Sequence, residues 1–138
     1  MSLRLPTVSL ILVTAAGCGG SDAVMGPGPG PSAPTLLVVQ SQIFTPRCAV
    51  SGCHVGASAP LGLDLSSVAD SAANLIDVPS GENSALMRVL PGDSANSYLY
   101  WKITGNPGIG GDPMPLTGGP LSPGDIDLVA SWIDGGAN

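Results

Sequence analysis

Basic and aromatic residues are both scarce in this chain. Four Lys and Arg residues stand against ten Asp and Glu, which gives a formal net charge of −6, and aromatic residues make up 4% of the 138 residues. An acidic chain is repelled by phosphate backbones and by anionic headgroups, so nucleic acid is not an expected partner. Few large side chains also mean a modest core for a small domain. A large apolar cofactor would supply the missing volume.

Histidine occurs once, and it directly follows a cysteine in the segment Cys48-Ala-Val-Ser-Gly-Cys53-His54. Two nearby cysteines with histidine after the second form the pattern of covalent haem attachment, in which each sulfur adds to a porphyrin vinyl group. The common motif has two residues between the cysteines and this chain has four, a longer loop that Gly52 can ease. The pattern predicts one haem c, attached through Cys48 and Cys53, with His54 as the proximal iron ligand.

A second iron ligand has to come from another residue type, because the chain has no other histidine. The thioether of methionine is the natural choice, and Met/His ligation raises the reduction potential. Met114 lies between Pro113 and Pro115, whose rings fix the backbone of a loop, so we expect Met114 to be the distal ligand. Met87 lies in an apolar stretch where methionine usually fills the core. Met25 lies in a glycine- and proline-rich segment that cannot form a pocket.

Three other interpretations remain open on these residues. A disulfide between Cys48 and Cys53 is compatible with their spacing, and would describe a haem-free, disulfide-stapled binding or structural lipoprotein. An iron open on its distal side would suit a haem enzyme or sensor. No acid–base pair accompanies the methionine, and the chain shows no nucleophile triad or phosphate loop, so we predict no enzymatic activity. A structural zinc site needs four ligands. With Cys18 used for the lipid, the chain offers two sulfurs and one imidazole, which are too few.

The first 17 residues resemble a bacterial lipoprotein signal peptide. A short start with one basic residue, Arg4, precedes an apolar run and the sequence Ala15-Ala16-Gly17-Cys18. This is similar to a lipobox, in which the cysteine receives a diacylglyceryl group, here Cys18; an ordinary signal peptide cleaved nearby is the alternative. Both predict export, to the periplasm or the outer membrane and cell surface. That compartment is where bacteria attach haem, and it also permits disulfides.

The rest of the chain divides at residue 35. Residues 18–35 are expected to contain the lipidated cysteine and a Gly/Pro-rich tether, and residues 36–138 are expected to form one domain with four helices. The first two cover 36–45 and 67–76. The third begins after Asp93 as its N-cap, runs through 97–103 and stops at Gly105.

The fourth expected helix has the clearest boundaries. Ser122-Pro123-Gly124-Asp125 combines an N-cap serine, a proline at the first helical position and an acid three residues after the cap. Gly135 is expected to end this helix. Its buried face is expected to contain Ile126, Val129, Ala130 and Ile133, with Trp132 at the rim.

In their order and spacing, several segments resemble a bacterial cytochrome c-like domain of exported planctomycete and myxobacterial proteins. They are residues 43–48, 52–54, 62–65, 89–93, 97–99, 114–115, 121–122, 132–133 and 136–137. The resemblance implies that residues 36–138 form a small all-α, cytochrome c-like domain with short helices and long Gly/Pro-rich loops. It also implies a haem between the cysteine segment and the methionine loop, held by Cys48, Cys53, His54 and Met114. The protein would then carry single electrons between redox partner proteins of the cell envelope, attached to the membrane through Cys18.

Overall fold

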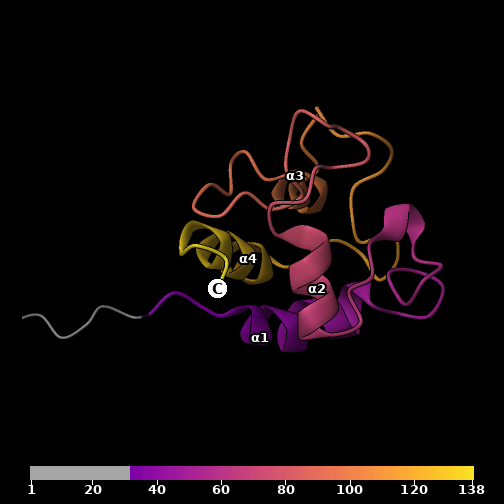
Figure 1. Cartoon of the computed structure of the whole chain (residues 1–138), viewed down its shortest axis with the longest axis horizontal. Helices are drawn as coiled ribbons and strands as arrows, with labels where there is room; N and C mark the ends of the chain where they lie inside the picture. The colour runs from indigo at the N-terminus through magenta and orange to yellow at the C-terminus, as the bar shows by residue number, and fades with distance from the viewer. Residues whose placement is uncertain (1–31) are drawn as a thin grey trace, which may run out of the picture. The chain divides into compact units, whose positions relative to one another are not determined.

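The computed structural model describes residues 32–138 and shows a helical domain (Figure 1). The predicted signal peptide, the lipidation site at Cys18, Met25 and most of the predicted tether lie outside these residues. Within 32–138 there are four short α-helices and no strand, and three isolated β-bridges join backbone segments between residues 76 and 97. No helix in this range is long and apolar enough to span a bilayer. The predicted all-α class is therefore confirmed.

The first helix is longer than predicted and changes type along its length. Helix α1 (Leu36–Val39) continues directly into the π-helix η1 (Gln40–Cys48), in which the turns are wider. Pro46 lies inside η1 and has no N–H to donate, which favours a departure from regular α-helix. The last wide turn closes where the N–H of Ala49 donates to the carbonyl of Phe44 at 2.7 Å. The helix thus ends at Cys48, the first predicted attachment residue.

Helix α2 (Val68–Leu75) confirms the predicted helix over 67–76. Its N-cap is Ser67, whose hydroxyl accepts the N–H of Asp70 at 3.1 Å. The helix is tied to η1 through the buried Gln40, whose amide oxygen accepts the Ser71 hydroxyl at 2.7 Å. The Gln40 amide nitrogen donates to the carbonyl of Leu65 at 2.8 Å, so one buried side chain joins three segments.

Helix α3 (Tyr98–Thr104) ends at Gly105 as predicted, in the left-handed conformation with φ +68°. The prediction that Asp93 is its N-cap is wrong, because Ser97 occupies that position. The Asp93 carboxylate instead accepts from the backbone N–H and side-chain amide of Asn96, at 3.1 and 2.7 Å. The Asp93 carboxylate therefore stabilises a separate turn over residues 93–96 and does not cap α3.

Helix α4 (Pro123–Asp134) begins with the predicted capping box. The Ser122 hydroxyl accepts the Asp125 N–H at 3.2 Å, and the Asp125 carboxylate accepts the Ser122 N–H at 3.3 Å. The predicted position of Trp132 at the rim is wrong, because this residue is 0% exposed. Its ring packs edge-to-face on Phe44, with centroids 6.1 Å apart. Helix α4 contacts both α1 and α3, so its buried face is wider than one stripe (Figure 1).

Candidate functional site

An apolar cavity of about 290 Å³ brings the predicted site residues together. Cys48, Cys53 and His54 line it from the Cys–His segment (residues 48–54), and Met114 lines it from the methionine loop (residues 105–120) between α3 and α4. The size is near the lower end of ligand-binding cavities, at about 300 Å³. The aliphatic residues of its wall are Leu61, Leu63, Leu65, Leu75, Leu99, Ile103 and Leu116.

The Cys–His segment folds back on itself through main-chain hydrogen bonds. The Cys53 N–H donates to the carbonyl of Val50 at 2.9 Å, and the His54 N–H donates to the carbonyl of Cys48 at 3.3 Å. Gly52 has φ +79°, a left-handed conformation that favours glycine. The four-residue spacing is therefore accommodated by a compact turn, with glycine at the position where the backbone needs it.

The hydrogen bonds of His54 define which of its ring nitrogens is free. Nδ1 lies 3.1 Å from the carbonyl oxygen of Leu63. A carbonyl can only accept, so Nδ1 carries the proton in the neutral ring and Nε2 keeps its lone pair. The backbone carbonyl of His54 also accepts the N–H of Leu65 at 2.9 Å. A metal-binding histidine commonly donates its other ring N–H to a carbonyl, as Nδ1 does here to Leu63, and this contact orients the ring.

Both cysteines of this segment carry free thiols and are half-buried. Burial raises the pKa of Cys48 to about 11, the nearby guanidinium of Arg47 opposes that rise, and Cys53 adds to it. The Cys48 thiol is therefore neutral at pH 7, and a neutral thiol is a poor nucleophile compared with a thiolate.

The methionine loop has mostly exposed residues around a half-buried Met114. The Met114 N–H donates to the carbonyl of Lys102 at 2.8 Å. Further along the loop, the guanidinium of Arg47 donates to the carbonyls of Gly118 and Gly119 at 3.1 and 2.8 Å. Met87, the other described methionine, is not among the residues that line the cavity.

Sequence reasoning missed the charged part of this site. Residues 32–138 contain three Lys and Arg residues, and all three line the cavity: Arg47, Arg88 and Lys102. Two features of the sequence could have pointed to these cations. Basic residues are scarce, and Arg47 directly precedes Cys48. Arg88 donates to the carbonyls of Asn74 and Leu61 at 2.8 and 2.6 Å, and burial lowers its pKa.

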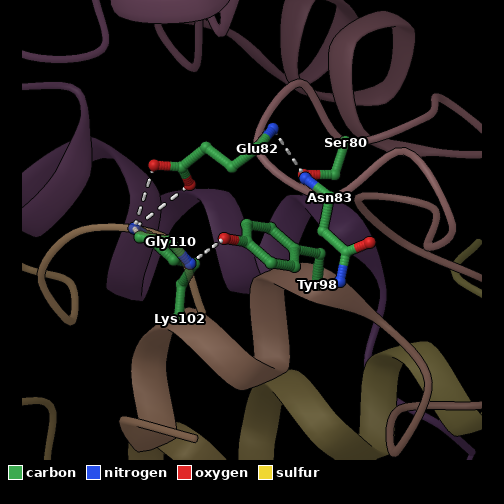
Figure 2. Close-up of polar contacts among 6 residues, drawn as sticks. All are labelled: Ser80, Glu82, Asn83, Tyr98, Lys102 and Gly110. Carbon is green, nitrogen blue, oxygen red and sulfur yellow. Dashed lines mark hydrogen bonds and ion pairs between the residues drawn. The ribbon is translucent and has the colours of Figure 1, made fainter. Parts of the chain in front are cut away.

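Lys102 is the third cation and forms an ion pair in the cavity wall (Figure 2). Its ammonium nitrogen lies 3.1 Å from a carboxylate oxygen of Glu82, and their side chains are 9% and 31% exposed. The same ammonium donates to the carbonyl of Gly110 at 2.8 Å. The Tyr98 hydroxyl accepts the Gly110 N–H, also at 2.8 Å, and burial is the main cause that raises the pKa of Tyr98.

Side chains that could bind a metal ion directly are few in this site. Within residues 32–138, no group of three or more His, Cys, Asp or Glu side chains lies close enough to hold a metal ion. Comparisons of the chain with protein-family models, curated proteins and solved structures found no match. The site is therefore interpreted from its own chemistry.

Proposed function

We propose that this protein is a lipid-anchored, exported, monohaem c-type cytochrome-like carrier of single electrons in the cell envelope. The observation that supports this most strongly is the meeting of two thiols, an imidazole and a thioether in the wall of one apolar cavity. Cys48 and Cys53 would hold the haem covalently, and His54 and Met114 would be its axial ligands. When bound, the haem supplies the one-electron redox chemistry.

The chemistry of the residues fits that cofactor. The cavity wall offers aliphatic side chains to the macrocycle, and the neutral His54 tautomer leaves Nε2 with a lone pair for iron. Met114 is the described methionine that lines this cavity. A pair of thiols on the same wall matches the two thioether bonds of a c-type haem. The two protein ligands to the iron would be His54 and Met114, so this site needs no cluster of acidic or cysteine ligands.

The protein's own contribution to electron transfer would be burial and ligand choice. The aliphatic residues of the wall would shield a bound haem from water, and a thioether ligand favours the reduced state relative to harder ligands. Both effects raise the reduction potential. The described domain carries nine carboxylates, while its three cations all line the cavity. The surface away from the cavity is therefore acidic, which suits docking to a basic redox partner.

The experiment that tests the proposal is the mass and the absorption spectrum of the full chain. It would be produced in a host that attaches c-type haem, beside the double variant Cys48→Ser/Cys53→Ser. We expect the denatured wild-type chain to be heavier by one haem and to show sharp reduced absorption bands, and the double variant to lose the covalent haem.

A different result would support the main alternative. A colourless wild-type chain two hydrogens lighter than its reduced form would contain a Cys48–Cys53 disulfide. The electron-transfer proposal would then be wrong, and a haem-free binding or structural lipoprotein would take its place.

A further inference from the structure

The part of the methionine loop that carries Met114 is held by very few residues. Every hydrogen bond that the described chain makes to residues 110–120 runs to Lys102, Tyr98 or Arg47. Lys102 and Tyr98 belong to α3, and both contact Gly110 (Figure 2). The hydrogen bonds that hold this part of the loop therefore come from three residues, Lys102, Tyr98 and Arg47.

Lys102 contacts this segment at two points four residues apart. Its ammonium donates to the Gly110 carbonyl at 2.8 Å, and its backbone carbonyl accepts the Met114 N–H at 2.8 Å. The ammonium is buried, and Glu82 at 3.1 Å is its ion-pair partner. A buried ammonium is stable only while it is paired. The ion pair and the loop contact should therefore form and break together.

We propose that Lys102 is a positioning residue for Met114, and that the Lys102–Glu82 pair is a latch that holds the methionine loop against the cavity. The latch fixes Gly110 through the side chain and Met114 through the main chain of the same residue. Arg47 holds the loop beyond Met114, at Gly118 and Gly119. Opening the latch should thus loosen residues 110–117, which would keep only the Tyr98 contact at Gly110 and the main-chain contact at Met114, while the end of the loop stays attached through Arg47. The redox consequence of this inference rests on the proposed function.

The first test is hydrogen exchange of the full chain, which needs no haem. Lys102→Met removes the ammonium and keeps a side chain of similar length. We expect amides in residues 105–117 to exchange about tenfold faster or more, as for the loss of a hydrogen bond to a charged group. Peptides from α2 should be unchanged. The matched control is Arg88→Met, which removes a cation from the same cavity wall but has no hydrogen bond to the loop.

The second test uses the haem-loaded chain. Its variant is Lys102→Leu, because methionine at position 102 would add a second thioether to the cavity wall. The variant should keep the mass of the attached haem, weaken the far-red absorption band given by thioether-bound ferric iron, and lower the reduction potential. Lys102→Arg, which keeps a cation, should restore part of the band. A merely structural residue would reduce the amount of folded protein and leave the spectrum of the remaining holoprotein unchanged.

The outcomes separate the latch from the proposed function. If no haem is attached in any variant, the function fails, while hydrogen exchange still decides on the latch. If loop exchange in Lys102→Met equals that of the wild type, or if Arg88→Met accelerates it equally, the latch is wrong. If Lys102→Met does not fold, Glu82→Gln decides. Faster exchange confined to 105–117 supports the latch, and unchanged exchange overturns it.

Discussion

The Cys–His segment and the methionine loop line the same cavity but are held in different ways. The Cys–His segment follows η1, whose Ile43 and Phe44 are 0% and 1% exposed, and its backbone bonds to itself and to Leu65. The methionine loop has mostly exposed residues and is held from outside by Lys102, Tyr98 and Arg47. One wall therefore continues from a core helix, with Cys48 and Ala49 packed against the core, and the other is attached to the domain mainly by polar contacts.

This difference suggests a division of tasks. A wall that is continuous with the core keeps its groups in place as long as the core is folded, which suits covalent attachment. A loop held by a few polar contacts can move without disturbing the core, because local opening needs only the free energy of those contacts. Substitutions on the two sides should therefore have different consequences.

The largest contrast is expected between the two proposed axial ligands. His54→Ala removes the proposed ligand in the Cys–His segment, and we expect most of the haem-loaded protein to be lost. Met114→Ala should keep the covalent haem and lower the reduction potential by on the order of 0.1 V, within the ~0.8 V range that axial ligands cover. Denatured mass and a redox titration measure both effects. Equal loss of haem in the two variants would contradict the division between the walls.

A second contrast concerns stability. Phe44→Ala removes a buried ring that packs on Trp132, and should lower the free energy of unfolding by about 3–5 kcal/mol. Leu116→Ala, at a loop residue that is 64% exposed, should change it by less than about 0.5 kcal/mol. Urea denaturation of the two variants beside the wild type provides the measurement. Similar losses in both would show that the methionine loop also belongs to the core.

The smallest of these effects is a pH dependence of the reduced, haem-free chain. The pKa of Cys48 is about 11 in the folded chain against an ordinary 9.0. Between these values the unfolded chain loses the proton and the folded chain keeps it, so stability falls as the pH rises from 9 to 11. The loss attributable to this thiol is about 2–3 kcal/mol.

The control for this pH dependence is Cys48→Ser, because serine does not titrate in this range. Tyr98 also has a raised pKa, so only the difference between the wild type and this variant reports on Cys48. Denaturation at pH 8 and at pH 11 gives that difference. A wild type and a variant that lose equal stability would mean that the thiol is not buried in solution.

Much of this architecture was predictable from local signals in the sequence. The features that depend on contacts between distant segments were not. The start of α4 was predictable because Ser122 and Asp125 satisfy each other's backbone within one turn. Asp93 was assigned wrongly because a neighbouring turn competes for the same carboxylate. The burial of Trp132 depends on Phe44, which is remote in sequence.

The candidate site shows the same limit. Cys48, Cys53, His54 and Met114 were identified from residue types and their neighbours, and all four line one cavity. The latch could not be predicted, because Lys102 and Glu82 lie in different segments and neither has a distinctive motif. Only the folded chain shows that a cation of α3 holds both Gly110 and Met114.

The contact between the two ends of the domain has a consequence for how the chain could be rearranged. The Leu36 N–H donates to the carbonyl of Asn138 at 2.6 Å, so a short linker would join these ends with little loss of chain entropy. A circular permutant opened in the exposed turn at Ser84–Ala85 would then place Met114 before the Cys–His segment along the chain. The cavity should survive this exchange, because its two walls meet in space and not through their order in the sequence.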